Sequence, residues 1–407
     1  MKKNFEIGKD TYWVGYVDDR KVPFHRLILE KGTTYNSYFL DTEKPTLIDT
    51  VDIEFGRVFV ENLSRFTDIS KLEYVVINHV EPDHAGGLPA LLSKAKNAKI
   101  VTTALGAEEL KNMFKLHNRE YIIIHDGMKL DIGGKTLQFF ETPFLHTEET
   151  MVTYCMEDKI LYPCDQFSTH IANHELFDDL AKEDITEDFN VYYQLIMHPH
   201  RPYVQDMLKK ISQLDIQMIA PSHGYVLREN VAQYIHAYDE MSKPKKDKKA
   251  AILFSTMTGN TTKVAKIIAE GLEKKHIETR IINVDKADVE SVLEVVRESD
   301  MIFFGSSTRY ADMVGKLEII LKEMKNMDLS SKLGVAFGSY GWSGEAVEVI
   351  NDYLKENGMK VIDSSYIIKV TGMDDVQVPL RVKFNPNEDE QRKLYRSIEI
   401  IGDLLVG

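Results

Sequence analysis

The sequence lacks the features of membrane-spanning, secreted and nucleic-acid-binding proteins. No stretch approaches the roughly 20 consecutive apolar residues that a membrane span needs. Lys2 and Lys3 are not followed by an apolar segment, so a secretory signal is not expected. The formal net charge of -14 argues against nucleic acid, whose binding is driven by cationic side chains. We therefore expect a cytoplasmic protein with neither a membrane nor a nucleic acid as partner.

Cysteine and nucleotide-binding motifs are also scarce. The only two cysteines, Cys155 and Cys164, do not form a C-x-x-C pair. We therefore expect no rubredoxin-like or iron–sulfur site within the chain. The G-x-x-x-x-G-K pattern of P-loop proteins is absent as well, which argues against ATP or GTP.

The pattern of apolar residues changes along the 407-residue chain, which is too long for one ordinary core. Up to about residue 240, short strand-like runs mix with helical segments at 55–66, 88–95, 106–116 and 204–213. A charged stretch with a proline, 242–249, then indicates a linker. We expect an α/β protein with a first domain over residues 1–248 and a second over 249–407.

The second domain shows a strict alternation of strand and helix. The expected strands are 250–254, 279–284, 301–305, 333–337 and 361–370. Helical segments follow each of them. This alternation is typical of a doubly wound parallel sheet, which binds ligands beyond the carboxyl ends of its strands.

Seven potential metal ligands occur in four short segments, each close to turn residues that end an apolar run. They are four histidines and three carboxylates: His79, Glu81, Asp83, His84, His146, Asp165 and His223. A single histidine at a strand end is most often a structural residue. A set of this composition and spacing, however, indicates a site for two metal ions.

The hexapeptide from His79 to His84 contains four of these residues. His79 and Glu81 are two residues apart, so an extended chain points both toward one side. Pro82 then turns the chain and directs Asp83 and His84 toward a second centre. Glu81 is a hard oxygen ligand where a dizinc hydrolase has a second histidine, and this favours iron over zinc.

Three loops of the second domain are candidates for a flavin site. The loop 255–261 is rich in hydroxyls and opens a helix, which suits a phosphate monoester, although such residues also serve simply as helix caps. The loops 306–310 and 338–344 follow the third and fourth strands and carry aromatic residues that can enclose a flat ring. The expected cofactor-binding residues are Thr256, Met257, Thr258, Gly259, Asn260, Thr261, Ser307, Thr308, Tyr310, Gly338, Tyr340, Gly341, Trp342 and Gly344.

With these motifs, nearly the whole chain resembles the flavodiiron proteins, also called A-type flavoproteins. The resemblance implies a metallo-β-lactamase-like αββα domain, followed by a flavodoxin-like domain with strand order 2-1-3-4-5. It also implies FMN, with its ring near Tyr310 and Trp342, and two non-haem irons. One iron would be held by His79, Glu81 and His146, the other by Asp83, His84 and His223, with Asp165 bridging them.

Two further positions, His25 and Tyr193, are similar to family residues that donate a proton or hydrogen bond to bound substrate. The chain departs from the family after His146. Thr147-Glu148-Glu149-Thr150 stands where the family usually has a tryptophan followed by Pro-Asp-Ser. The resemblance therefore leaves the pocket beside this ligand, and the preference between substrates, open.

The resemblance implies a reductase that converts O2 to water, NO to N2O, or both, in defence against oxygen or nitrosative stress. Electrons would come from a separate rubredoxin-like or deazaflavin-type donor. The protein would be a head-to-tail homodimer or a dimer of dimers. Two alternatives stay open: a binuclear zinc hydrolase with a flavodoxin-like regulatory domain, and a flavin electron carrier or sensor.

Overall fold

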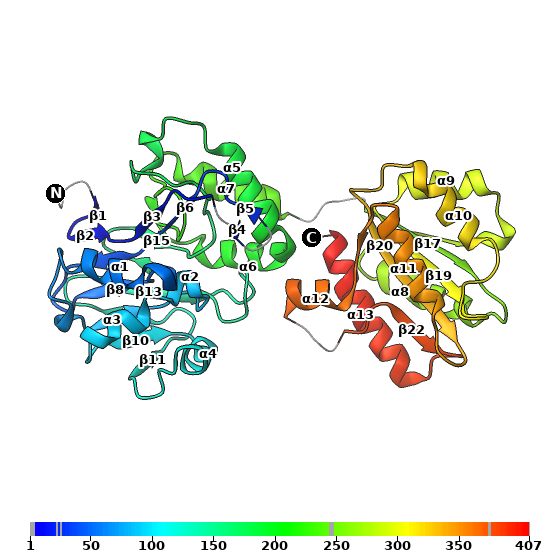
Figure 1. Ribbon diagram of the computed structural model, residues 1–407, viewed down its shortest axis with the longest axis horizontal. Coiled ribbons are helices and arrows are strands. Elements are labelled where there is room, and N and C mark those ends of the chain that lie inside the picture. Colours follow the sequence, from blue (N-terminus) through cyan, green and yellow to red (C-terminus); the bar gives the residue numbers. More distant parts are fainter. Residues whose placement is uncertain (1–4, 22, 25–26, 244–247, 373–375, 407) are drawn as a thin grey trace. The chain divides into compact units, whose positions relative to one another are not determined.

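The computed structural model describes residues 5–21, 23–24, 27–243, 248–372 and 376–406. The chain forms two compact units, Met1–Lys243 and Pro244–Gly407 (Figure 1). The boundary expected between residues 248 and 249 falls just before strand β17 (Lys249–Ser255). Residues 244–247 lie outside the described part, so the exact extent of each domain stays a prediction.

The first unit contains two facing sheets. The seven-stranded sheet has the order β1 (Glu6–Gly8), β2 (Thr11–Trp13), β7 (Tyr38–Leu40), β8 (Thr46–Ile48), β9 (Tyr74–Val76), β10 (Lys99–Thr102) and β11 (Tyr121–Ile123). The five-stranded sheet has the order β12 (Lys129–Asp131), β13 (Thr136–Glu141), β14 (Met151–Cys155), β15 (Ile160–Tyr162) and β16 (Met218–Ile219). Two small two-stranded sheets accompany them: β3 (Tyr16–Asp18) with β6 (Thr33–Tyr35), and β4 (Pro23–Phe24) with β5 (Leu27–Ile28).

The alternation of side chains along each strand sorts them into separate layers of the core. In β7, Tyr38 and Leu40 pack between the two sheets, while Phe39 packs on the outer, helical side. Helices α1 (Gly56–Leu63), α3 (Leu88–Lys94) and α4 (Ala104–Phe114) cover that outer side. Helices α5 (Thr186–Tyr192), α6 (Arg201–Ile211) and α7 (Val231–Ser242) cover the other sheet. The result is the expected αββα arrangement.

Helices α5 and α7 were not predicted from the sequence. Helix α5 is short, and several of its residues, including Thr186, Asn190 and Val191, have weak intrinsic helix propensity. Its buried side chains, Phe189 and Tyr192, pack into the core beneath the second sheet. Tertiary packing therefore stabilises this helix more than its own residues do.

The second unit is a parallel sheet with the order β18 (Glu278–Asn283), β17, β19 (Met301–Ser307), β20 (Leu333–Tyr340) and β21 (Lys360–Val361). Helices α8 (Asn260–Glu273) and α13 (Glu388–Val406) cover one face. Helices α9 (Val289–Glu298), α10 (Leu317–Glu323) and α11 (Ala346–Glu356) cover the other face. This confirms the doubly wound, flavodoxin-like fold with strand order 2-1-3-4-5.

The fifth strand was predicted as one segment over 361–370, but the structure divides it into two short strands. Strand β21 ends at Val361, helix α12 (Ser364–Thr371) follows, and β22 (Leu380–Lys383) then pairs with the same neighbour, β20. The side chain of Asp363 accepts a 2.7 Å hydrogen bond from the Tyr366 amide and so caps α12. This local cap overrides the strand propensity of the β-branched residues that follow.

In the described part of the chain, no helix has both the length and the apolar character needed to cross a membrane.

Candidate metal centre and flavin site

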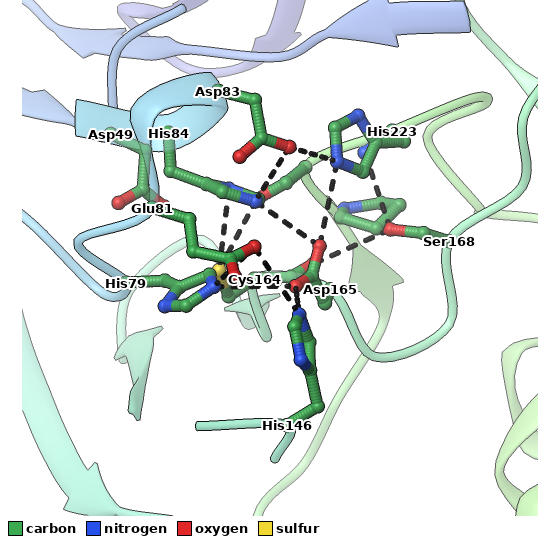
Figure 2. A network of polar contacts seen from close by, with 12 residues as sticks. Asp49, His79, Glu81, Asp83, His84, His146, Cys164, Asp165, Ser168 and His223 are labelled. Atoms are coloured by element: carbon green, nitrogen blue, oxygen red, sulfur yellow. Dashed lines mark hydrogen bonds and ion pairs between the residues drawn. The ribbon is translucent and has the colours of Figure 1, made fainter. Parts of the chain in front are cut away.

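The structure brings all seven predicted metal ligands together in the first unit (Figure 2). His79 and Glu81 follow β9, and Pro82 begins the short helix α2 (Pro82–Ala85), which carries Asp83 and His84. The other three ligands lie in the loops that follow strands of the second sheet: His146 after β13, Asp165 after β15 and His223 after β16. Loops that are distant in the sequence therefore meet beside both sheets.

Asp165 stands between two groups of ligands. Its Oδ2 atom lies 3.3 Å from Nε2 of His146 and 3.8 Å from Nε2 of His79. Its Oδ1 atom lies 3.3 Å from Nε2 of His84 and 3.4 Å from Nε2 of His223. Each oxygen of this one carboxylate thus faces a different pair of imidazoles, which is the arrangement of a bridging ligand.

Each group also has a carboxylate of its own. Oε2 of Glu81 lies 3.4 Å and 3.5 Å from Nε2 of His79 and His146. Oδ2 of Asp83 lies 3.3 Å and 3.4 Å from Nε2 of the two histidines of the second group. The two groups are therefore matched, each with two imidazoles, one carboxylate and a share of Asp165.

The geometry of the cluster fits metal ions. The separations are longer than most N–H···O hydrogen bonds, which span about 2.7–3.2 Å. All but the 3.8 Å separation between Asp165 and His79 are 3.3–3.5 Å, close to the roughly 3.0–3.4 Å between neighbouring ligands of a metal bound at about 2.1 Å. Among the described residues, the Nε2 atom of His79 is fully buried without a hydrogen-bond partner. A metal ion would satisfy this atom.

The electrostatics of the cluster also favour a cation. Burial lowers the pKa of His146, but contacts with Asp165 and Glu81 raise it to about 9. Burial opposes ionisation of Asp165, but the imidazoles of His84 and its neighbours hold the pKa of this carboxyl well below its usual value. The carboxylates are therefore ionised, and a bound metal would replace the imidazole protons.

Contacts behind the ligands orient the imidazoles, and the sequence did not reveal them. Nδ1 of His79 donates a 2.6 Å hydrogen bond to Oε1 of Glu149. Nδ1 of His223 donates a 2.7 Å hydrogen bond to the backbone oxygen of Thr34. Burial raises the pKa of Glu149, but His79 lowers it to about 2. The unusual segment after His146 was the one sequence signal that could have drawn attention to Glu149.

The tyrosine that reaches the cluster differs from the predicted one. The hydroxyl of Tyr192 donates a 3.0 Å hydrogen bond to Oδ1 of Asp165. Tyr193, which was predicted for this neighbourhood, is buried against Tyr238 with ring centroids 4.9 Å apart. Its ring contacts among the described residues are with Tyr238 and His198, neither of which is a candidate ligand. His25 lies outside the described residues.

The expected flavin-binding loops meet at the carboxyl edge of the parallel sheet. The Thr261 hydroxyl lies 2.9 Å from that of Ser307 and 2.8 Å from that of Ser339. Gly259 has a φ of 83° at the start of α8, and its amide donates a 3.1 Å hydrogen bond to Oγ1 of Thr256. The hydroxyl contacts connect the start of α8 with the carboxyl ends of β19 and β20. Ser339 lies within the predicted loop 338–344 but was not among the expected cofactor-binding residues.

The remaining predicted flavin residues lie in the loops after these strands, at the start of α8 and at the end of β20. Met257, Thr258 and Asn260 surround the start of α8; Thr308 and Tyr310 follow β19; Gly338 and Tyr340 end β20, and Gly341, Trp342 and Gly344 follow it. Gly338 sits so close to β19 that a Cβ atom there would lie 2.6 Å from the backbone oxygen of Ser306. This contact explains the need for glycine at that position.

Large aromatic side chains are exposed at this edge. Trp342 is 93% exposed and Tyr310 is 86% exposed. Phe384, which was not predicted, follows β22 and is also exposed; its amide donates a 2.8 Å hydrogen bond to the backbone oxygen of Tyr340. Packing within the unit does not account for such exposure, whereas stacking against a flat ring would.

The fold and the two sites define a class of protein: a metallo-β-lactamase-like unit with a candidate dinuclear metal centre, joined to a flavodoxin-like unit. A family model described as ODP family beta lactamase matches residues 34–224, and a flavodoxin model matches residues 252–398. A flavodoxin domain implies FMN as its cofactor.

The relatives identify the family. The chain is 35% identical over 363 residues to the anaerobic nitric oxide reductase flavorubredoxin of Klebsiella pneumoniae, covering 87% of this chain and 75% of that protein. It is 34% identical over 399 residues to an uncharacterized protein of Methanocaldococcus jannaschii, covering 98% of each. The chain belongs to the family of flavodiiron proteins and flavorubredoxins.

Solved structures agree with this assignment. The flavodiiron protein from Giardia intestinalis is 28% identical with a TM-score of 0.58, covering 98% of this chain and 95% of that one. The rubredoxin oxygen:oxidoreductase of Desulfovibrio gigas is 26% identical with a TM-score of 0.58, covering 98% of both chains. The flavodiiron relatives carry a non-haem diiron centre. Relatives named for nitric oxide and oxygen reduction support an oxidoreductase.

Proposed function

We propose that this protein is an FMN-containing diiron reductase that converts O2 to water, NO to N2O, or both, in defence against oxygen or nitrosative stress. The observation that carries the proposal is the position of Asp165 between two matched groups of ligands. A carboxylate with one oxygen toward each group can hold two metal ions side by side. Two adjacent metals suit a diatomic substrate, or two NO molecules at once.

The proposal assigns His79, Glu81 and His146 to one iron, Asp83, His84 and His223 to the other, and Asp165 to both. Seven protein ligands do not fill two six-coordinate spheres, so positions stay open for substrate. Bound ferrous ions and reduced FMN would supply electrons. O2 with four electrons and four protons gives two H2O, and two NO with two electrons and two protons give N2O and H2O.

The residues of the chain would orient the site rather than carry electrons. Tyr192 holds Asp165 through its hydroxyl, and Glu149 and the Thr34 carbonyl fix the rings of His79 and His223. In the second unit, the hydroxyls and amides at the start of α8 would bind the FMN phosphate, because a helix amino terminus favours anions. Tyr310 and Trp342 would flank the flavin ring.

Electrons would enter from a separate donor of the rubredoxin or deazaflavin type. We further propose a homodimer or dimer of dimers, arranged head to tail, in which the flavin of one subunit serves the irons of another. Sedimentation analysis at micromolar concentration tests the assembly. A stable monomer with full activity would contradict it.

The first experiment measures metal and flavin content after anaerobic reconstitution with ferrous salt. We expect about two irons and one FMN per chain, followed by donor-driven consumption of O2 or NO, and the relative rates determine the substrate. Asp165→Asn should lose most of the bound iron. Asp239→Asn is the control and should keep it, because Asp239 belongs to a separate group with His236 and Glu240.

The other outcomes separate the alternatives. Two zinc ions that ferrous iron does not replace, together with hydrolytic activity, would favour the binuclear hydrolase. A fully loaded protein that turns over neither O2 nor NO would favour the electron carrier or sensor.

A further inference from the structure

We propose that Glu149 is a positioning residue that makes the His79–Glu81–His146 metal position richer in electrons than its neighbour. The proposal rests on the function proposed above, because it concerns a metal pair in this cluster. The proposal is based on the hydrogen-bond acceptors of the ligand imidazoles, which differ between the two metal positions. The ligands themselves are matched.

The contact of Glu149 with His79 is short and buried. Oε1 of Glu149 accepts hydrogen bonds from Nδ1 of His79, at 2.6 Å, and from the backbone amide of Val80, at 3.1 Å. The side chain of Glu149 is only 2% exposed. A hydrogen bond to Nδ1 leaves Nε2 of His79 as the unprotonated nitrogen that faces the cluster, which is the state a metal ligand requires.

The backbone of Glu149 is also held in place. Its carbonyl oxygen accepts a 2.8 Å hydrogen bond from the hydroxyl of Thr103. The same hydroxyl accepts a 3.0 Å hydrogen bond from the Gly106 amide and so caps helix α4. The loop after β13 thus supplies one ligand, His146, and supports another, His79, through a residue anchored to a helix terminus.

Among the described residues, neither histidine of the second metal position directs its Nδ1 atom to a carboxylate. The buried carboxylate of Asp49 interacts electrostatically with His84, but it accepts its hydrogen bonds from the backbone amide and the side chain of Asn78. His223 donates to the neutral backbone oxygen of Thr34. Nδ1 of His84 lies 3.6 Å from the Sγ atom of Cys164, a weak and neutral partner (Figure 2). The ligand charges are equal, since Glu81 on one side matches Asp83 on the other and Asp165 is shared.

A charged acceptor strengthens the hydrogen bond and raises the basicity of the imidazole that donates it. A more basic imidazole stabilises the higher oxidation state of its metal. We therefore expect the iron at the His79 position to be bound more tightly and to be oxidised first. The two irons would then be distinguishable before any substrate binds.

The test compares Glu149→Gln with Glu148→Gln in the full-length, iron-loaded protein. The amide keeps nearly the same shape but removes the charge, and Glu148 is the exposed neighbour. Three quantities are measured: the iron affinity by chelator competition, the Mössbauer spectrum of each iron, and the two reduction potentials between which the mixed-valent state exists. Circular dichroism verifies folding.

In Glu149→Gln we expect one of the two irons to bind about 10- to 100-fold more weakly, as is typical when such a partner is lost. The spectrum of that iron alone should change, and the first oxidation should shift to higher potential. Glu148→Gln should match the unaltered protein. If Glu149→Gln does not fold, Glu149→Asp replaces it, because it keeps the charge with a shorter reach and should give a smaller shift in the same direction.

An unchanged spectrum and potential in Glu149→Gln, or an equal change at both irons, would overturn the proposal. An unaltered protein that does not bind an iron pair would instead overturn the proposed function. Because the unaltered protein is measured first, these two failures are distinguishable.

Discussion

The hydroxyl of Tyr192 donates a 3.0 Å hydrogen bond to Oδ1 of Asp165, the carboxylate that lies between the two ligand groups. Hydrogen bonds to charged groups contribute about 1.5–3 kcal/mol. Tyr192→Phe should therefore lower the free energy of unfolding by about this amount and weaken iron binding. Urea denaturation and chelator competition measure the two effects.

Tyr193→Phe is the matched control for that variant, because the adjacent ring packs on Tyr238 instead. It should leave iron binding and turnover unchanged. If Tyr193→Phe impaired turnover while Tyr192→Phe did not, the role assigned to Tyr193 from the sequence would be correct and the contact of Tyr192 would be incidental.

Gly259 and Gly358 form a matched pair for testing the phosphate loop. Both have positive φ, 83° and 75°, and an added Cβ atom would meet nothing within 4 Å at either position. Alanine at either site should cost about 1–2 kcal/mol of stability, because the left-handed conformation is strained for residues other than glycine. Thermal unfolding of the apoprotein measures this cost.

Gly259→Ala alone should also weaken FMN binding, by up to about tenfold, because the strain is relieved when the loop at the start of α8 moves. Fluorescence titration of the apoprotein with FMN measures the affinity. Equal affinities in the two variants would mean that this loop does not hold the phosphate.

Trp342→Ala should separate flavin binding from stability. Because Trp342 is 93% exposed, its loss should change the free energy of unfolding by less than about 0.5 kcal/mol. Loss of ring stacking should weaken FMN binding by about two- to tenfold. Ile319→Ala, at an exposed position on α10, should change neither quantity. Unchanged FMN affinity in Trp342→Ala would remove this residue from the flavin site.

Glu109 should give stability a distinct pH dependence. Burial, followed by the charge of Glu149, raises its pKa from 4.5 to about 7. The folded state therefore holds this proton more tightly than the unfolded state does. The contribution of this group to the free energy of unfolding is fully present below about pH 4.5. It is lost as the pH rises through about 7.

Glu109→Gln should remove this dependence and make the metal-free protein more stable than the unaltered one at pH 8, with little difference at pH 4. Urea denaturation across this range measures the effect, and Glu108→Gln, at an exposed position, is the control. A greater stability loss at pH 8 than at pH 5 in Glu109→Gln would reverse the expected sign.

The residues chosen from the sequence as metal ligands share features that are local in the chain. The hexapeptide from His79 to His84 carries its own turn at Pro82, and the other ligands each follow an apolar run. Such patterns can be identified from the sequence because strand ends and turns are determined by residues only a few positions apart. The loops proposed to bind flavin were chosen for a similar reason, since parallel strands end at one edge of a sheet.

Contacts between segments that are distant in the chain could not be predicted from the sequence. Glu149 and His79 are 70 residues apart in the sequence, and their contact depends on how the loop after β13 packs against the loop after β9. The choice between Tyr192 and Tyr193 depends on the helical phase where α5 continues into the π-helix Tyr193–Met197. The break in the fifth strand was missed for a different reason: the cap of α12 by Asp363 is a local contact with the amide three residues on, and it was not used in the prediction from the sequence.

By itself, the amino-acid sequence determined the two-domain α/β organisation, the kinds of ligand atoms available and the hydroxyl-rich loop 255–261. Each of these follows from residue type and short-range spacing. The tertiary structure alone decided that Asp165 turns one oxygen toward each ligand group, and that Nδ1 of His79 meets a buried carboxylate whereas Nδ1 of His223 meets a backbone oxygen. Those differences arise from packing between loops that are far apart in the chain, and residue spacing carries no information about such packing.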